Sequence, residues 1–189
     1  MTDLAPMIRP SALPSAERNG AYQIAVATPR HIHSIACGLQ HRERLSQWLR
    51  TGYGLALPDP GHMATKNGVT ILSSAQDQWF LEQEGNITDE VSTPLEHALS
   101  GIASVTEQTG GWVRFEIRGP KLTKVFSRLC PLDAEQMAKD KVARANIHHI
   151  GCLVWPVGPG FAVMGPRSMA RSLWHTLKDA ALSASIQSH

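Results

Sequence analysis

The chain has 189 residues, enough for one compact domain or two small fused modules, and it carries a net charge of only +2. This weak charge, with no run of basic residues interleaved with aromatic ones, argues against a nucleic-acid-binding protein. Charged residues make up 18% of the chain, below the roughly 25% usual for soluble domains. We therefore expect part of the surface to be buried in an oligomer.

The cysteines and the N-terminal residues suggest a cytoplasmic protein. Cys37, Cys130 and Cys152 form no C-x-x-C pair, so they predict neither a disulfide framework nor a zinc ribbon. Residues 1–20 lack the apolar stretch of a secretory signal, and no apolar run approaches about 18 residues, so no membrane span is expected. Because residues 1–20 are proline-rich and aperiodic, they are predicted to form an extended arm.

Residues 21–108 are predicted to form a first α+β module. Leu45, Trp48 and Leu49 indicate a short helix that ends at Gly52. Thr93 and Glu96 fit a capping box around Pro94, which predicts a second helix that ends near Gly101. Strands are expected at residues 22–27, 31–37 and 102–106, and a hairpin is expected from residues 69–73 and 78–82.

Residues 109–189 are predicted to form a second module, whose clearest signal is Trp112 to Asp133. In residues 112–118 apolar and polar side chains alternate, which predicts a half-buried strand. Gly119 ends this strand, and Pro120 is expected at the first position of a helix over residues 120–129. The helix has one apolar stripe, formed by Leu122, Val125, Phe126 and Leu129, and is expected to end at Cys130-Pro131.

The rest of this module is predicted to contain one long or two shorter strands over residues 144–155, and a turn at Gly158-Pro159-Gly160. A strand over 161–164 and a final helix marked by Met169, Leu173, Leu177 and Ala181 follow. The order β-α-β-β-α-β, present nearly twice, predicts an α+β fold of two fused ferredoxin-like (split βαβ) modules.

No catalytic constellation is evident in the sequence. His31 and His33 share a strand face but lack a third metal ligand, and His148 and His149 would point to opposite faces of a strand. Cys130 lies near a helix C-terminus, where the dipole disfavours a thiolate. Because there is no G-x-S-x-G, G-x-G-x-x-G or Walker A motif, we predict no catalytic, cofactor-binding or metal-binding residue in this chain.

Exposed arginines and a tryptophan instead indicate a subunit interface. Arg167 and Arg171 are four residues apart and are predicted to share a face of the last helix, where they would bind carboxylates of another subunit or face solvent. Aromatic side chains and arginines are typical of interface cores. The predicted interface residues are Trp112, Arg114, Arg118, Arg167 and Arg171.

Three segments resemble the gamma subunit of heterotetrameric sarcosine oxidases and related bacterial secondary-amine oxidases or dehydrogenases. They are the strand, Gly-Pro and helix that lead to Leu129-Cys130-Pro131-Leu132-Asp133, the stretch from Pro166 to Trp174, and the stretch from Gly52 to Pro58. The resemblance covers about residues 31–183 and implies a fold like the folate-binding domain of the glycine cleavage T-protein.

The resemblance also implies the partners and the cofactors. Alpha, beta and delta subunits would form the complex, with FAD and FMN on beta, NAD and tetrahydrofolate sites on alpha, and zinc on delta. The gamma-like chain would stabilise a cytoplasmic complex that oxidises sarcosine or a similar N-methyl amine, without catalytic residues of its own.

Two alternatives remain open. A stand-alone folate-binding one-carbon protein would need the threonine-glycine-glutamate turn of the T-protein, and the nearest stretch, Thr109-Gly110-Gly111, lacks the acid. Asp133 matches an aspartate of that family, although aspartate is also an ordinary turn residue. A ligand-free dimeric module without redox partners is the third interpretation.

Overall fold

The computed structural model describes residues 13, 15–27, 30–85 and 95–186. The chain divides into two compact units, each built around its own antiparallel sheet. Unit 1 comprises residues 1–27, 110–139 and 143–189, and unit 2 comprises residues 28–109 and 140–142. The predicted fold of two fused α+β modules is confirmed, and each unit is described by itself.

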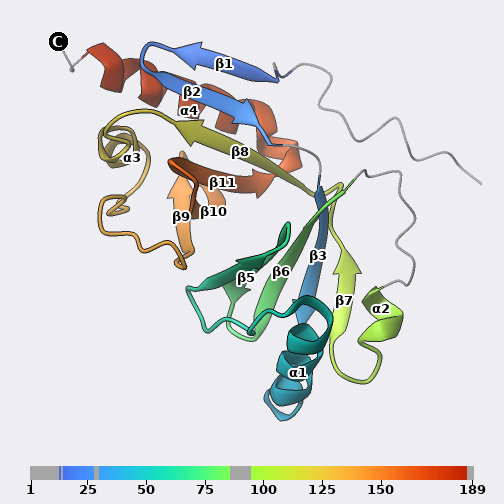
Figure 1. Ribbon diagram of the computed structural model, residues 1–189. Coiled ribbons are helices and arrows are strands. Elements are labelled where there is room, and N and C mark those ends of the chain that lie inside the picture. The colour runs from blue at the N-terminus through green and yellow to red at the C-terminus, as the bar shows by residue number, and fades with distance from the viewer. Residues whose placement is uncertain (1–12, 14, 28–29, 86–94, 187–189) are drawn as a thin grey trace, which may run out of the picture. The chain divides into compact units, whose positions relative to one another are not determined.

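Unit 1 contains a six-stranded sheet in the order β1-β2-β8-β11-β10-β9 (Figure 1). Its strands are β1 (Ala16–Asn19), β2 (Tyr22–Val26), β8 (Trp112–Arg118), β9 (Ala143–Ile147), β10 (Ile150–Val157) and β11 (Gly160–Pro166). Its helices are α3 (Thr123–Leu129) and α4 (Ala170–Ile186), and a 3-10 turn, η3 (Arg167–Met169), precedes α4.

Residues 16–19 and 22–26 belong to this sheet, and this differs from the expected domain boundaries. Strand β2 pairs with β8 from Gln23↔Arg118 to Val26↔Phe115, so residues 21–27 lie in unit 1 and not in the first module. Ala16–Asn19, expected in the extended arm, forms β1 against β2. The rest of the arm, residues 1–12 and 14, lies outside the described residues. Strand β2 thus supplies the fourth strand that β8, β10 and β11 need for a ferredoxin-like sheet.

One face of the unit 1 sheet packs against α3 and α4. Val113, Phe115 and Ile117 of β8, predicted to share a face, all lie in this core. The predicted apolar stripe of α3 lies there too, and so do Leu173, Leu177 and Ala181 of α4. The apolar residues of the strand and those of the helices therefore pack into one core. Because each set is buried on one side only, its period-2 or period-3.6 pattern is visible in the sequence.

Unit 2 contains a five-stranded sheet in the order β4-β5-β6-β3-β7. Its strands are β3 (Arg30–Ala36), β4 (Met63–Lys66), β5 (Val69–Ala75), β6 (Gln78–Glu84) and β7 (Ser104–Glu107). Its helical elements are the 3-10 turn η2 (Leu39–His41), α1 (Arg42–Tyr53) and α2 (Leu95–Ala98). Apart from β4, this is the sheet order of a split βαβ unit.

The core of unit 2 joins α1 and α2 to one face of its sheet. Leu45 and Leu49 of α1 meet Ile35, Ile71 and Leu81 of the sheet. The predicted β5–β6 hairpin is confirmed. The capping-box residues Thr93 and Pro94 lie outside the described residues. Strand β4 was not predicted, although the Asn67-Gly68 turn that joins it to β5 is a strong hairpin signal.

Two local predictions in unit 1 are wrong. Helix α3 begins at Thr123 because Lys121 adopts a left-handed conformation with φ 46°, which places Pro120 outside the helix. His148 and His149 do not lie in a strand with opposite faces. They form the two-residue turn between β9 and β10, with φ 47° and 66°, and both are exposed.

Within the described part of the chain, no helix is long and apolar enough to cross a membrane.

All three thiols are predicted to be unreactive in the native protein. Cys130 and Cys152 are buried in unit 1 and Cys37 is buried in unit 2. Burial raises the pKa of each thiol, that of Cys152 to about 12. Since the thiolate is the reactive form, a thiol reagent near pH 8 should label all three cysteines quickly only in denaturant, and about 100-fold more slowly in the native protein. Rapid labelling of a native cysteine, located by mass spectrometry, would contradict this packing.

Candidate functional site

Strand β8 carries an ion-paired row on the face opposite the helices. Glu116 accepts a hydrogen bond from Nη2 of Arg114 at 2.5 Å and another from Nη2 of Arg118 at 2.9 Å. The Arg114 guanidinium also lies 5.4 Å from the ring centroid of Trp155 on β10. Burial by itself would raise the pKa of Glu116, but its bonds to the two arginines outweigh burial and lower that pKa.

This row changes the interpretation of the arginines. Arg114 is 8% exposed and its charge is compensated by Glu116 within unit 1, so little of its side chain is accessible, and its predicted place at an interface stays a prediction. Arg118 keeps 51% of its side chain exposed and stays available to a partner. The alternation of β8 placed both arginines on one face, but which of them is exposed depends on neighbouring strands.

Arg167 fixes the start of β8. Its Nε donates to the carbonyl of Gly110, its Nη2 donates to the carbonyl of Trp112, and its backbone N–H donates to the carbonyl of Gly111, each at 2.9 Å. Burial lowers the pKa of the Arg167 guanidinium. These contacts make Arg167 an internal anchor of unit 1.

Arg167 lies outside α4, which corrects the prediction that it belongs to the last helix together with Arg171. Arg167 lies in the 3-10 turn η3, whereas Arg171 is exposed in the first turn of α4. The structure brings Arg167 together with the half-buried Trp112, and Arg114 together with Arg118 through Glu116. Whether any of the five residues contacts a partner subunit stays a prediction.

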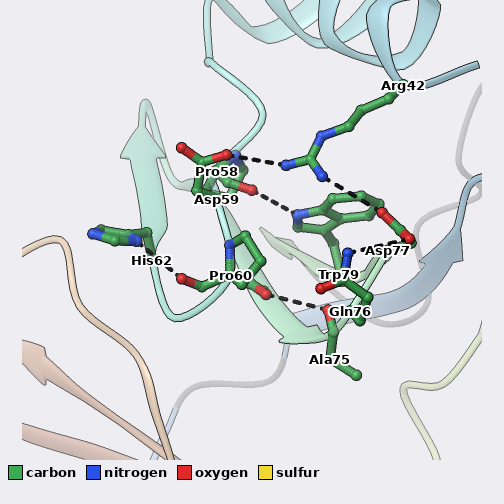
Figure 2. A network of polar contacts seen from close by, with 10 residues as sticks. Arg42, Pro58, Asp59, Pro60, His62, Ala75, Gln76, Asp77 and Trp79 are labelled. Atoms are coloured by element: carbon green, nitrogen blue, oxygen red, sulfur yellow. Dashed lines mark hydrogen bonds and ion pairs between the residues drawn. The ribbon is translucent and has the colours of Figure 1, made fainter. Parts of the chain in front are cut away.

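A polar network that the sequence did not reveal holds the loop after α1 (Figure 2). Arg42, at the start of α1, binds Asp59 at 3.1 Å and Asp77 at 3.5 Å, and its guanidinium lies 5.5 Å from the ring centroid of Trp79. The buried Trp79 donates from Nε1 to the carbonyl of Pro58 at 2.9 Å. The network anchors Pro58, the last residue of the Gly52–Pro58 stretch on which the family resemblance partly rests.

The segment Leu129–Asp133 is also used for internal structure. The carboxylate of Asp133 accepts hydrogen bonds from the backbone N–H groups of Glu135 and Gln136, each at 3.2 Å. This is the capping geometry of an ordinary aspartate turn. The nearest equivalent of a T-protein turn, Thr109-Gly110-Gly111, is bound too, since Arg167 occupies the carbonyls of both glycines.

The histidine pair of β3 is split between a buried and a half-buried position. His33 is 7% exposed, and within the described residues its Nδ1 has no hydrogen-bond partner. Burial lowers the pKa of His33, and His31 adds to this effect, while the carboxylates of Glu107 and Glu96 oppose it. Across the described ranges, no group of three His, Cys, Asp or Glu residues could hold a metal ion.

Comparison with solved structures supports the fold. The chain is similar to a chain of the heterotetrameric sarcosine oxidase from Corynebacterium sp. U-96, solved in complex with pyrrole 2-carboxylate, with 18% identity over 90% of this chain and 89% of that chain and a TM-score of 0.72. It is also similar to the glycine cleavage system aminomethyltransferase T from Bartonella henselae, with 16% identity over 82% of this chain and 44% of that chain and a TM-score of 0.58.

No protein-family model matches the sequence, and no curated protein matches it. At these identities the two structures establish a shared fold, and that fold is the one expected from the T-protein resemblance.

The Trp79 network gives a stability prediction. Trp79→Phe removes the hydrogen bond to Pro58 and leaves that buried carbonyl unpaired, so the free energy of unfolding should fall by about 1–3 kcal/mol in urea denaturation. Trp48→Phe, at a half-buried position on α1, is the matched control and should cost less. Equal losses in the two variants would show that the Trp79 hydrogen bond is not specifically important.

His33 gives a pH prediction. Because its pKa is lower in the folded protein than in the unfolded chain, the unfolded chain binds more protons below about pH 6.5, and stability should fall as the pH drops toward 5. His33→Phe should weaken this pH dependence of the free energy of unfolding, whereas the control His97→Phe, at an exposed position on α2, should retain it. An unchanged slope in His33→Phe would show that another group titrates.

Proposed function

We propose that this chain is a non-catalytic, gamma-type subunit of a cytoplasmic, heterotetrameric, flavin-dependent oxidase of sarcosine or a similar N-methyl amine. The observation that carries the proposal is the fold likeness to a sarcosine oxidase chain along nearly the whole of both chains. The segments Leu129–Asp133 and Pro166–Trp174 point the same way from the sequence. In such a complex, FAD, FMN, NAD, tetrahydrofolate and zinc belong to the alpha, beta and delta subunits.

The structural roles of the resembling segments fit a stabilising subunit. Cys130, Leu173 and Trp174 are buried in the core of unit 1, Arg167 anchors the start of β8, and Asp133 caps a turn. These residues maintain a shape and leave the chemistry to partner chains. Substrate choice, and the use of oxygen or another electron acceptor, would then be decided outside this chain.

The alternative of a stand-alone folate-binding one-carbon protein keeps one argument, the T-protein fold. The residues that would have to bind folate argue against this alternative. Arg167 already binds the carbonyls of Gly110 and Gly111, and the carboxylate of Asp133 already accepts hydrogen bonds within its own turn. Tetrahydrofolate binding by the isolated chain, measured by calorimetry, would favour this alternative over the subunit function.

The subunit function predicts which proteins and cofactors co-purify with the chain from its native cell. A tagged chain purified at native expression level should bring down larger chains in fixed proportion, with a flavin absorption band and sarcosine-dependent formaldehyde release. An untagged strain is the control for adventitious proteins. A colourless chain that elutes alone would contradict the proposal.

A further inference from the structure

Two Asn-Gly dipeptides occur in the chain, at Asn19-Gly20 and Asn67-Gly68. An asparagine followed by glycine can lose its side-chain amide without an enzyme. The backbone nitrogen of the glycine attacks the Cγ atom of the asparagine within the same chain, and glycine has no side chain to obstruct the approach. Both dipeptides connect two antiparallel strands, so their sequences do not distinguish them. The structure places them in different surroundings.

Asn67-Gly68 forms the whole loop between β4 and β5. Lys66 and Val69 are the last paired residues on either side, so both loop residues lie beyond the paired part of the hairpin. Their φ values are 50° and 78°, the positive values that a type I′ turn requires, and Asn67 is exposed. The carbonyl of Gly68 accepts a hydrogen bond from the backbone N–H of Glu84 at 3.1 Å, on the side of the glycine away from the attacking nitrogen. Water therefore reaches the side chain that would react.

Asn19-Gly20 is packed into unit 1 instead. Asn19 is 6% exposed and pairs with Tyr22 across the hairpin of β1 and β2. Its Nδ2 atom is buried, and its carbonyl accepts a hydrogen bond from Oγ of Ser185 on α4 at 3.3 Å. A Cβ atom on Gly20 would collide with the same Oγ, so α4 packs closely against this turn. Ring closure at Asn19 therefore requires the turn to separate from the helix first.

We propose that Asn67 is a site of spontaneous deamidation in the native protein, and that its packing protects Asn19. The nitrogen of Gly68 forms a bond to Cγ of Asn67 and loses its proton, while the side-chain nitrogen leaves as ammonia. The product is a five-membered succinimide ring. Water opens the ring at either carbonyl and leaves aspartate or isoaspartate at position 67. The net reaction consumes one water molecule and releases one ammonia.

The two products affect the hairpin differently. Aspartate before Gly68 still suits the loop, because Asp-Gly is favoured in type I′ turns as Asn-Gly is. Isoaspartate directs the main chain through the former side chain and adds one methylene group to a two-residue loop. Since loop length fixes the register of a hairpin, isoaspartate should loosen β4, an edge strand of the unit 2 sheet. Either product adds one negative charge to a chain of net charge +2.

Ageing of the purified full chain at mildly alkaline pH tests the proposal. Peptide mapping by mass spectrometry follows Asn19 and Asn67 in the same sample, and enzymatic methylation detects isoaspartate. In the native protein Asn67 should react about ten-fold faster than Asn19 or more, since reaction at Asn19 requires local opening of a packed turn. In urea the two rates should agree within a factor of about two, because unfolding exposes both dipeptides.

Two variants at the exposed position identify the reacting residue. Asn67→Gln lengthens the side chain, so the five-membered ring cannot form, and the fast release of ammonia should disappear. Asn67→Asp should migrate with the acidic band that appears in the aged wild-type protein on isoelectric focusing. An Asn67 that stays intact in the native chain, or equal native rates at Asn19 and Asn67, would overturn the proposal. Since the chain is tested alone, neither result affects the subunit function.

Discussion

The pairing of β2 with β8 is the constraint on which the architecture of unit 1 depends. Strand β8 lies inside the sheet, between β2 and β11, and its Val113, Phe115 and Ile117 pack in the core with α3 and α4. The N-terminal strand therefore completes a sheet whose other strands come from residues beyond Gly110. Most of unit 2, residues 28–109, is therefore inserted in the sequence between the paired strands β2 and β8. Deleting residues 16–26 would remove β1 and β2 and expose the edge of β8, a hazard that folded sheets normally avoid.

The segments that resemble a known family serve mainly to hold the chain together. Arg167 joins the 3-10 turn before α4 to the start of β8, the carbonyl of Pro58 accepts the hydrogen bond of Trp79, and Asp133 caps its own turn. Residues that stabilise the fold in this way indicate which fold the chain adopts, and this is why the resemblance predicted the architecture well. The same residues carry little information about chemistry, because one fold supports several functions.

Local sequence patterns predicted the elements whose own side chains define them. Strand β8, the β5–β6 hairpin and the stripe of α3 needed only the alternation or the helical period of apolar residues. The wrong predictions concern elements whose structure depends on an unusual backbone conformation or on pairing with another strand. Lys121, His148 and His149 adopt positive φ values that residue type rarely predicts, and β1 becomes a strand only because β2 lies beside it.

The sequence by itself determined which residues share a face: Arg114, Glu116 and Arg118 on one side of β8, and Val113, Phe115 and Ile117 on the other. Only the tertiary structure decided that Arg114 is buried against Glu116 and Trp155 while Arg118 is exposed, and that Arg167 binds its own chain. The period of a strand or helix is a local property, fixed by backbone geometry. Burial and ion pairing depend on residues far apart in the sequence, so they follow from the packing of the whole unit.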